Sequence, residues 1–362
     1  MKILYAIQGT GNGHLSRARD IIPILQKNHS VDILISGSQS DIELPFPVRY
    51  RLKGLGFVFG KNGGVDMLET FRKNHVKSFF SEIKSLPVFD YDLILNDFEP
   101  VSAWACKLFD VKCISLSHQS AVLNKNVPQP KEIDLLGKTI LKNYAPATSR
   151  YGFHFKAYDK NIFTPVIRKE LRDQKVENSG HYTVYLPAYD DKRIVKVLQQ
   201  CEDTHWQVFS KHNKTAITEG NISIQPINND TFIKSMATSE GVLCGAGFET
   251  PAEALYMNKK LMVIPMKGQF EQLCNATALR EIGVPVLKSL KEKHIDKLKS
   301  WIATEARIEV NYPDNTEEII ETLLSRHTVD LRNESLQLDK SEYSLEKFRT
   351  LLLKKYRQFN TL

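Results

Sequence analysis

The stretch Lys2-Ile-Leu-Tyr-Ala-Ile-Gln-Gly-Thr-Gly-Asn-Gly-His-Leu-Ser-Arg17 decides the fold class. It begins with an apolar run typical of a buried strand, passes through three glycines and continues as an amphipathic helix. Glycines let the backbone approach an anion, and the first turn of a helix offers unpaired N–H groups and the positive end of the helix dipole. The stretch therefore predicts a strand, a phosphate-handling turn and a helix, the opening unit of a doubly wound sheet.

The same alternation of short apolar runs and amphipathic stretches continues along most of the chain. Strands are expected near 2–7, 31–36, 93–96, 112–116, 182–186, 207–210, 223–225, 241–244, 261–265 and 284–287, and helices near 15–27, 65–86, 100–109, 191–200, 230–236, 250–256, 270–282 and 291–303. The Pro-broken region 117–147 predicts loops around one helix, and a long irregular insertion of this kind is often functional. The expected fold is α/β, with two doubly wound Rossmann-like domains in tandem.

The polar run from Arg168 to Gly180 has little to bury and indicates a linker between the two domains. The expected organisation is a first domain over 1–165, a linker over 166–180, a second domain over 181–325 and an extension over 326–362.

The composition fits a globular protein of this size. The chain has 362 residues, of which 42% are hydrophobic and 25% charged, and its formal net charge is +7. Residues 1–165 carry 21 basic and 15 acidic side chains, a surplus of six, whereas the remainder is close to neutral. Either the first half faces an anionic partner, or the surplus lysines only keep the protein soluble.

The cysteines and the N-terminus indicate a cytoplasmic protein. The five cysteines are scattered, form no C-x-x-C pair and lie mostly in apolar runs, which is typical of reduced, buried thiols. The chain enters a strand without a charged leader, and no apolar run approaches the roughly 18 residues of a membrane span. We expect no export signal and no membrane span.

His14 is the residue of the first turn that suggests chemistry. A dinucleotide turn of the form G-x-G-x-x-G would have glycine at this position, and a P-loop would need Gly-Lys-Ser/Thr, so neither motif fits. The helix dipole favours a neutral imidazole here, whose free nitrogen can act as a general base toward a hydroxyl. The alternative is a polar side chain that only completes the turn.

A carboxylate partner for His14 is expected after the strand at 93–96. Asp97 and Glu99 follow that strand on the side where open α/β sheets bind their ligands. Either can orient His14, as a carboxylate orients the histidine of a catalytic triad. Asp97 also fits as the N-cap of the helix that begins near Pro100, and the two roles are compatible.

A second strand, glycine turn and helix lie at Leu243-Cys-Gly-Ala-Gly-Phe-Glu-Thr-Pro-Ala-Glu-Ala-Leu255. Thr250-Pro-Ala-Glu253 has the pattern of a capping box with proline at the first helical position, which gives Glu253 a structural interpretation. Polar side chains also crowd the start of the next helix, after the strand near 261–265. They are Gln269, Glu271, Gln272 and Asn275.

Together these motifs resemble the GT-B nucleotide-sugar glycosyltransferases. Gly245–Leu255, then Val263-Ile-Pro265 and Glu271-Gln-Leu-Cys-Asn-Ala276, resemble their donor-site signature. Gly9-Thr-Gly-Asn-Gly-His14 resembles their N-terminal glycine loop. The motifs are most similar to those of the lipid-linked N-acetylglucosaminyltransferases of peptidoglycan synthesis and of the UDP-glucuronosyltransferase-like superfamily.

The resemblance implies two doubly wound domains that face each other across a cleft, with a nucleotide sugar, usually a UDP-sugar, as co-substrate and no further cofactor. Glu253 would hold the ribose hydroxyls, and Glu271 and Gln272 would bind hydroxyls of the sugar. Gly11 and Gly13 would lie against the nucleotide sugar. Gly245, Ala246 and Gly247 would approach its diphosphate, and Thr250 would lie at the start of the helix that follows.

The resemblance also implies a mechanism. His14 would deprotonate an acceptor hydroxyl with Asp97 in support, and the reaction would be a direct inverting displacement. Helix N-termini would stabilise the leaving diphosphate in place of a metal ion.

Two stretches differ from the resembling enzymes. Leu186-Pro-Ala-Tyr-Asp-Asp191 replaces a glycine- and serine-rich loop, and its carboxylates would repel a diphosphate if they pointed inward. Asp90-Tyr-Asp92 has the D-x-D pattern of metal-dependent transferases, but it precedes a strand, which favours a turn. No other set of His, Cys, Asp and Glu has metal-ligand spacing, so no metal is expected.

Nucleic-acid binding is not expected, because it needs clustered basic residues and those of the first half are dispersed. Residues Ser341–Phe359 predict an amphipathic helix with a basic polar face, which either packs on the first domain or lies on anionic lipid. Val76-Lys-Ser-Phe-Phe80 or the region 117–147 can supply apolar contact to a membrane that carries a lipid-linked acceptor.

The sequence therefore predicts a cytoplasmic glycosyltransferase, with peripheral contact to the inner face of the cell membrane as an expectation. Two alternatives stay open: an enzyme like the UDP-N-acetylglucosamine 2-epimerases, which use the same double domain, and a sugar-nucleotide-binding protein without catalysis.

Overall fold

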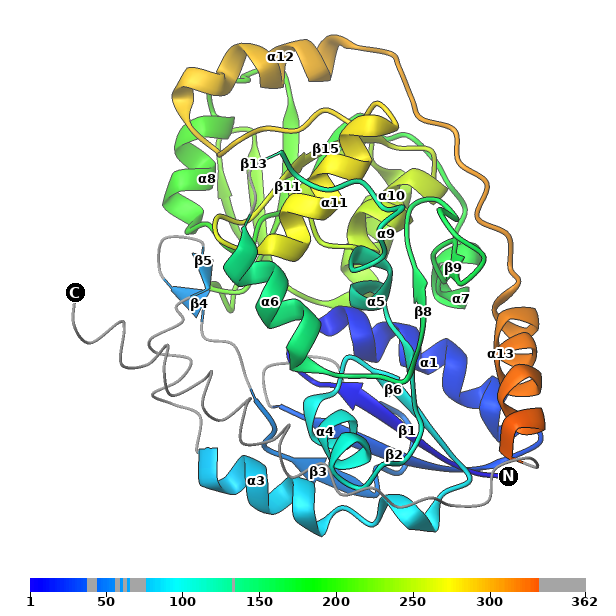
Figure 1. Ribbon diagram of the computed structural model, residues 1–362. Coiled ribbons are helices and arrows are strands. Elements are labelled where there is room, and N and C mark those ends of the chain that lie inside the picture. The colour runs from blue at the N-terminus through cyan, green and yellow to red at the C-terminus, as the bar shows by residue number, and fades with distance from the viewer. Residues whose placement is uncertain (38–43, 56–58, 61–63, 66–75, 132–133, 332–362) are drawn as a thin grey trace.

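The computed structural model describes residues 1–37, 44–55, 59–60, 64–65, 76–131 and 134–331. Within these residues, each half of the chain forms one large sheet that is covered by helices (Figure 1). Both sheets follow the alternation of strands and helices that the sequence predicts. The α/β class and the tandem arrangement are therefore confirmed.

The first sheet is parallel throughout. Its described strands follow the spatial order β3 (Tyr50–Leu52), β2 (Ser30–Ser36), β1 (Lys2–Gln8), β6 (Leu93–Asp97), β7 (Cys113–Leu116), β8 (Ser149–Phe153) and β9 (Ile162–Phe163). β4 (Phe59–Gly60) and β5 (Gly64–Val65) form a small antiparallel pair. Because β1 and β6 are neighbours and Ile7 is paired with Asp97, the segments that follow these two strands emerge side by side.

The helices of the first half are α1 (Asn12–Gln26), α3 (Val76–Ser85), α4 (Pro100–Leu108), α5 (His118–Val122) and α6 (Leu135–Tyr144), with a 3₁₀ turn, η1 (Val88–Asp90). Of the helix expected over 65–86, residues 66–75 lie outside the described residues. The expectation of one helix in 117–147 is wrong, because this region holds both α5 and α6. Each has its own N-cap: Ser117 Oγ accepts from the Ser120 N–H at 3.1 Å, and Asp134 Oδ1 from the Gly137 N–H at 2.7 Å.

The second sheet has the order β12 (Ile217–Glu219), β13 (Ile222–Pro226), β11 (His205–Ser210), β10 (His181–Tyr185), β14 (Gly241–Gly245) and β15 (Lys260–Ile264), with only β12 antiparallel. The strand expected over 284–287 is wrong. The segment makes a single bridge, between Val263 and Val286, because Pro285 has no N–H to extend the ladder.

The helices of the second half are α7 (Lys169–Arg172), α8 (Asp191–Leu198), α9 (Asn229–Thr238), α10 (Glu249–Tyr256), α11 (Phe270–Glu281), α12 (Ile295–Ala303) and α13 (Thr316–Leu331), with a 3₁₀ turn, η2 (Glu292–His294), before α12. After α12 the chain runs down the outside of the molecule, and α13 packs on α1 (Figure 1). Lys27 and Glu317 form an ion pair between them. The amphipathic helix expected over 341–359 lies outside the described residues.

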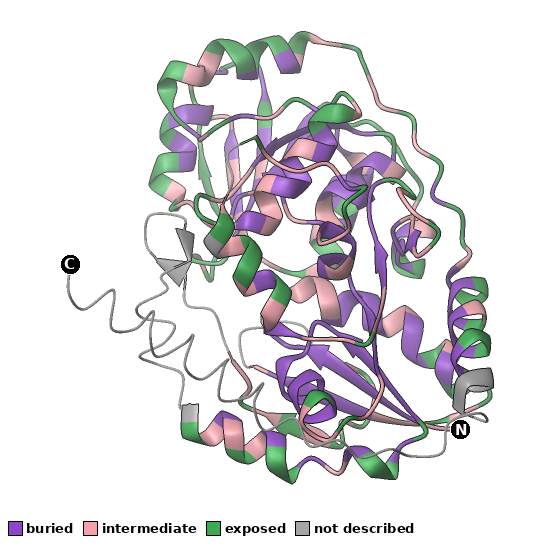
Figure 2. Ribbon diagram, in the orientation of Figure 1, coloured by how far each residue is buried: buried purple, intermediate pink, exposed green. Residues whose placement is uncertain are grey.

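One cluster of buried apolar side chains runs through both halves, from Ile3 and Tyr5 on β1 to Val242 and Cys244 on β14. Figure 2 shows that the central strands of both sheets are buried, whereas the edge strand β12 is exposed. At the junction, Phe155 and Phe248 have ring centroids 5.3 Å apart. The two halves are therefore in direct apolar contact.

All five cysteines are buried free thiols, as the sequence predicts.

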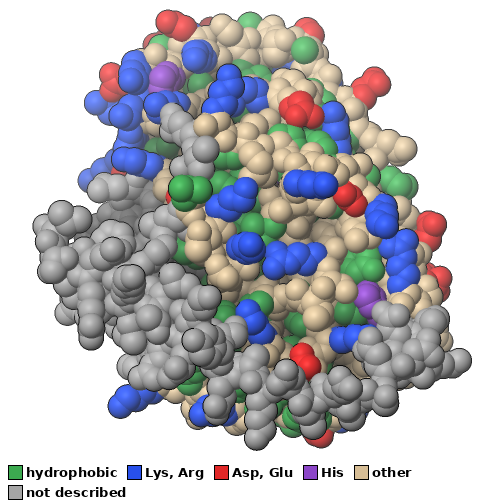
Figure 3. Space-filling model, in the orientation of Figure 1, with side chains coloured by type: hydrophobic (Ala, Val, Ile, Leu, Met, Phe, Trp, Pro, Cys, Tyr) green, Lys and Arg blue, Asp and Glu red, His purple; other side chains and the backbone are tan. Residues whose placement is uncertain are grey.

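Basic side chains gather on the second half, which is nearly neutral by count. Figure 3 shows Lys and Arg side chains clustered at the upper left, where α8 and α12 lie. Burial and the neighbouring Lys293, Lys297, Lys291 and Lys288 lower the pKa of His294 in this region. Counting charge by halves therefore misses a local concentration of lysines.

Candidate active site

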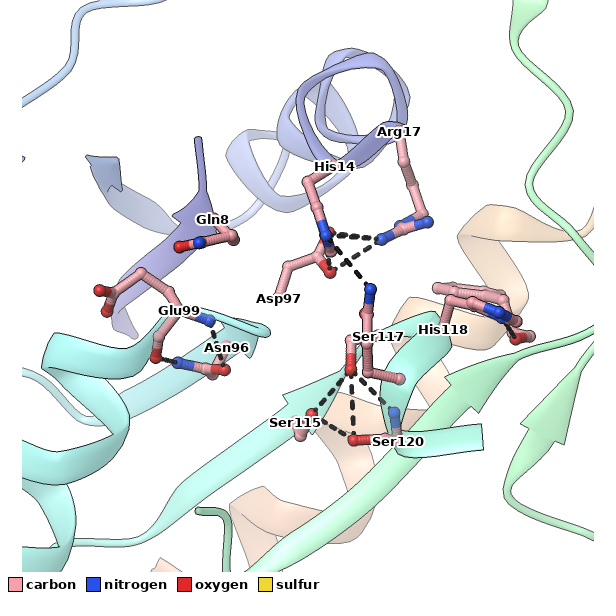
Figure 4. A network of polar contacts seen from close by, with 12 residues as sticks. Gln8, His14, Arg17, Asn96, Asp97, Glu99, Ser115, Ser117, His118 and Ser120 are labelled. Carbon is pink, nitrogen blue, oxygen red and sulfur yellow. Dashed lines mark hydrogen bonds and ion pairs between the residues drawn. The ribbon is translucent and has the colours of Figure 1, made fainter. Parts of the chain in front are cut away.

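His14 and Asp97 meet at the carboxyl ends of the neighbouring strands β1 and β6. After β1 the chain turns at Gly11, whose φ of 107° lies in the region that favours glycine, and α1 begins at Asn12. His14 is thereby placed in the first turn of α1. Its Nδ1 lies 2.8 Å from Oδ1 of Asp97 (Figure 4).

The contact with Asp97 determines which nitrogen of His14 carries the proton. An ionised carboxylate only accepts hydrogen bonds, so Nδ1 is the donor. The lone pair is then on Nε2, which faces the side-chain amide nitrogen of Gln119 at 3.4 Å. This is the arrangement that a general base requires.

Asp97 is fully buried and stays ionised. Burial works against ionisation, but Arg17 and His14 hold the pKa of Asp97 below its ordinary value. Arg17 Nη2 lies 2.8 Å from both oxygens of this carboxylate. The next residue, Phe98, has a φ of 58°, which is unusual for a residue other than glycine, and its ring stacks on His14 with centroids 6.4 Å apart.

Glu99, and not Asp97, is the N-cap of α4, so the capping role expected for Asp97 is wrong. The Glu99 carboxylate accepts from the N–H groups of Val101 and Ser102 at 2.7 and 2.6 Å. Asn96 Nδ2 donates to the Glu99 carbonyl at 2.7 Å and fixes this turn. Because Glu99 caps the helix, the Asp97 carboxylate is free of that role and contacts His14.

The turn after β14 leaves room beside its glycines. A Cβ at Gly247 would meet nothing within 4 Å, and one at Gly245 would meet only Gln272 Oε1 at 3.8 Å and Ile264 O at 4.0 Å. The Ala246 carbonyl accepts from Asn275 Nδ2 at 3.1 Å. Thr250 lies in the first turn of the helix that follows.

The capping box expected at Thr250–Glu253 is wrong. α10 begins at Glu249 after Phe248, with no side-chain cap. The Glu253 carboxylate is buried instead against Arg168, the residue before α7, with Nε 2.7 Å from Oε1. Burial of a charge is tolerated here because the opposite charge is beside it.

Gln119 connects the two halves at the first turn of α11. Its Nε2 donates to Oε2 of Glu271 at 3.0 Å and also faces Nε2 of His14. His14 and Glu271 therefore lie on either side of one amide group. Gln272 Oε1 accepts from the Met266 N–H at 2.8 Å and lies beside Gly245 of the turn after β14.

The carboxylates at Asp190 and Asp191 have local partners. Asp190 caps α8 by accepting from the Arg193 N–H at 2.9 Å. Asp191 accepts from Ser210 Oγ at 2.8 Å and from Asn213 Nδ2 at 2.5 Å. In the D-x-D stretch, Asp90 ends η1, and Asp92 Oδ2 accepts from the Lys2 N–H at 2.7 Å, so this pair forms a turn before β6.

Sequence reasoning missed several side chains that the structure brings to the site. Arg17 and Glu249 form an ion pair between the halves. His118 joins the halves as well: its Nε2 lies 2.7 Å from Asn275 Oδ1, and its ring stacks on Phe248 with centroids 3.9 Å apart. One signal pointed to Arg17, namely its position three residues after His14 on one helix face.

No group of three or more His, Cys, Asp and Glu side chains among the described residues is arranged to hold a metal ion. No helix in the described part of the chain combines the length and apolar character needed to cross a membrane.

Comparison with known proteins identifies the family. Residues 1–304 match the sequence model of Glycosyl transferase family 1. The curated proteins contain no match. Among solved structures, the chain is similar to LpCGTa in complex with UDP, with a TM-score of 0.57 and 10% identity over 90% of this chain and 99% of that chain.

The chain is also similar to Arabidopsis thaliana UGT89C1 complexed with UDP, with a TM-score of 0.54 and 12% identity over 97% of this chain and 99% of that one. A third similar structure is the glycotransferase of kitacinnamycin, with a TM-score of 0.53 and 10% identity over 91% and 95%. These likenesses confirm the GT-B fold. The chain therefore belongs to glycosyl transferase family 1 and is a glycosyltransferase.

Proposed function

We propose that this glycosyltransferase moves a sugar from a nucleoside diphosphate sugar, with UDP as the nucleotide, to an acceptor hydroxyl that His14 deprotonates. The observation that carries the proposal is the position of Gln119, whose amide lies between His14 Nε2 of the first half and Glu271 of the second. A base and a carboxylate suited to sugar hydroxyls thus face each other where the halves meet. The UDP complexes of two structures with the same fold support the choice of nucleotide.

The donor is proposed to lie along the turn after β14. Gly245, Ala246 and Gly247 approach the diphosphate, whose charge is stabilised by the N-terminus of α10 beside Thr250. Glu271 and Gln272 bind the sugar hydroxyls. Glu253 binds the ribose while its Oε1 keeps the contact with Arg168.

On the side of the first half, Gly11 and Gly13 let the turn after β1 approach the nucleotide sugar. Gly13 also has a packing role, since a Cβ there would lie 2.9 Å from Glu249 Cγ.

The reaction is proposed to be a single displacement with inversion. His14 Nε2 takes the proton of the acceptor hydroxyl, the oxygen attacks the anomeric carbon, and the bond from that carbon to the diphosphate oxygen breaks. Asp97 stabilises the imidazolium that forms. The helix N-terminus stabilises the leaving UDP, so the proposed mechanism uses no metal ion and no cofactor.

The acceptor is proposed to be anionic or lipid-linked, at the inner face of the cell membrane. The surplus of six positive charges on residues 1–165 supports this proposal. Binding of the whole protein to anionic vesicles, with loss of binding as salt is raised, is the expected result. Equal binding to neutral vesicles would contradict it.

The test of the proposed function combines binding with turnover. UDP at 100 times its dissociation constant should stabilise the protein by about 2.7 kcal/mol, which a thermal shift detects. His14→Ala should keep this shift and lose about 10²- to 10⁴-fold in sugar transfer. The proposed UDP donor is wrong if UDP gives no shift, and the base is wrong if His14→Ala retains full turnover.

The same assay separates the two alternatives. Conversion of UDP-N-acetylglucosamine without any acceptor would identify a 2-epimerase-like enzyme. Binding of UDP without turnover of any UDP-sugar, across a panel of acceptors, would favour a catalytically silent binding protein.

A further inference from the structure

Arg17 is a fully buried arginine one turn after His14 on α1. Its side chain is 1% exposed. Residues three apart on a helix lie on the same face, so the His14 and Arg17 side chains both reach the end of β6. There Arg17 Nη2 contacts both oxygens of Asp97 at 2.8 Å and lies 3.3 Å from His14 Nδ1 (Figure 4).

The other end of the same guanidinium crosses to the second half. Nη1 donates to Oε1 of Glu249, the first residue of α10. Glycine at position 13 permits this approach, because a Cβ there would lie 2.9 Å from Glu249 Cγ. The Arg17 side chain also lies over the Phe153 ring, with Cζ 5.5 Å from its centroid. One side chain therefore connects α1, β6, β8 and α10.

Two carboxylates compensate the buried positive charge of Arg17. A buried guanidinium is stable only with carboxylate partners, and Arg17 has two, one from each half. Both also raise the pKa of Arg17 despite its burial. In return, Arg17 keeps Asp97 ionised and therefore able to accept a hydrogen bond from the N–H at His14 Nδ1.

We propose that Arg17 is a positioning residue for the sugar transfer. It fixes the Asp97 carboxylate against Nδ1 of His14, and through Glu249 it ties that arrangement to the donor turn of the second half. The proposal rests on the proposed function, because only a base role gives the orientation of His14 a reaction to serve. A lysine carries its charge on one ammonium group, so it can pair with Asp97 or with Glu249. It cannot contact both carboxylates at once, as the planar guanidinium does.

The proposal predicts a change in the protonation of His14. The charged groups around this imidazole are Asp97 on β6, Arg17 on α1, Glu249 on α10 and, through Gln119, Glu271 on α11. Arg17 is their only permanent cation among the described residues. Without it, the negative charge of Asp97 acts on His14 unopposed and favours the imidazolium, which cannot act as a base.

The experiment compares Arg17→Gln, Arg17→Lys and a matched control, Arg19→Gln, on the same helix. Arg19 forms an exposed pair with Glu170, with a distance of 3.3 Å, which contributes little. The midpoint of the His14 titration is measured by NMR, with His14→Ala used to assign the signal. Sugar transfer is measured as kcat against pH.

In Arg17→Gln we expect the titration midpoint and the acid limb of kcat to move to higher pH, and the misplaced base to lower kcat at least tenfold at neutral pH. Arg17→Lys should keep the wild-type midpoint but lose kcat, and Arg19→Gln should match the wild type. Loss of turnover in Arg17→Gln with an unmoved midpoint would overturn the proposal, since a purely structural role predicts that result.

If Arg17→Gln does not fold, Arg17→Lys decides. Unchanged turnover in that variant would overturn the proposal, because a point charge would then be sufficient. The NMR titration needs no substrate. A wild-type protein that transfers no sugar therefore contradicts the proposed function, while a fixed His14 midpoint contradicts the role of Arg17.

Discussion

Arg168 and Glu253 form a buried ion pair in which the guanidinium Nε lies 2.7 Å from the carboxylate Oε1. Arg168 lies immediately before α7, and Glu253 lies on α10, the helix that follows the turn after β14. A further contact, from Arg168 Nη1 to Asn229 Oδ1 at 2.8 Å, orients the guanidinium. The pair therefore attaches the start of α7 to α10, the helix that is proposed to hold the donor.

Replacing Arg168 with methionine should destabilise the protein strongly. The substitution leaves Glu253 buried without its cation, and loss of one partner of a buried pair costs about 3 to 5 kcal/mol. Chemical denaturation of the wild type and of Arg168→Met measures the difference. The double variant Arg168→Met/Glu253→Leu should recover part of the loss, because it removes both charges.

A matched control for this prediction is Lys175→Met in the exposed pair of Lys175 and Glu177. Exposed pairs contribute about 0 to 1 kcal/mol, so this variant should unfold close to the wild type. Equal unfolding free energies for Arg168→Met and Lys175→Met would show that burial does not increase the contribution of the Arg168 pair to stability.

Asp97→Asn should abolish most of the turnover with little effect on UDP binding. Asparagine fills the same space but carries no charge to hold His14 Nδ1 as a donor and to stabilise the imidazolium. The equivalent change in a catalytic triad costs about 10⁴-fold, so we expect a loss of at least about 100-fold in kcat. Asp92→Asn, at the exposed start of β6, is the control and should keep full activity.

The sequence was sufficient to predict the fold because its signals are local. Apolar runs and glycine turns predicted the central strands of both sheets to within a few residues, including β1 and β14. Strands β8 and β9, at one side of the first sheet, are not predicted, since they follow a segment whose prolines indicate loops around one helix. The pairing of His14 with Asp97 was also within reach, because neighbouring parallel strands end at the same edge.

The rest of the site depends on contacts between distant residues. The capping pattern at Thr250–Glu253 is a local rule, and it failed because Arg168, 85 residues away, competes for the carboxylate. Arg17 and Glu249 are 232 residues apart, and nothing local to either indicates the other. Such pairs are determined by how the two halves pack against each other. Local sequence patterns, such as turn residues and hydrophobic periodicity, carry no information on that packing.

Gly13→Ala should destabilise the junction of the two halves. Its Cβ would lie 2.9 Å from Glu249 Cγ, so the Glu249 side chain must move away from Arg17. We expect a loss of about 1 to 3 kcal/mol, as for other overpacked sites, visible as a lower melting temperature. An unchanged melting temperature would mean that Glu249 is free to move without cost.

Gly247→Ala should leave stability unchanged and weaken UDP binding, in contrast to Gly13→Ala, which should lower stability. A Cβ at this position meets nothing within 4 Å, so the melting temperature without ligand should match the wild type. If the turn contacts the diphosphate as proposed, the methyl group blocks that approach and reduces the thermal shift given by UDP. A full UDP shift in this variant would remove Gly247 from the proposed site.

Glu249→Gln should change how stability depends on pH. Burial, and the nearby Glu253 and Asp97 against the opposing effect of Arg17, raise the pKa of Glu249 from 4.5 to about 7. Between these values the folded protein keeps a proton that the unfolded chain has released, so the unfolding free energy falls as pH rises through this window. Glutamine has no such proton. The melting temperature of the wild type relative to Glu249→Gln should therefore be highest near pH 4.5, decline up to about pH 7 and then level off.

Glu281→Gln is the control for this prediction. It alters an exposed carboxylate paired with Lys156 at 3.8 Å, and its melting temperature should change with pH in parallel with that of the wild type. A difference between the wild type and Glu249→Gln that stays constant or grows from pH 5 to 8 would show that Glu249 is ionised throughout, in which case Arg17 outweighs the burial of the carboxyl group.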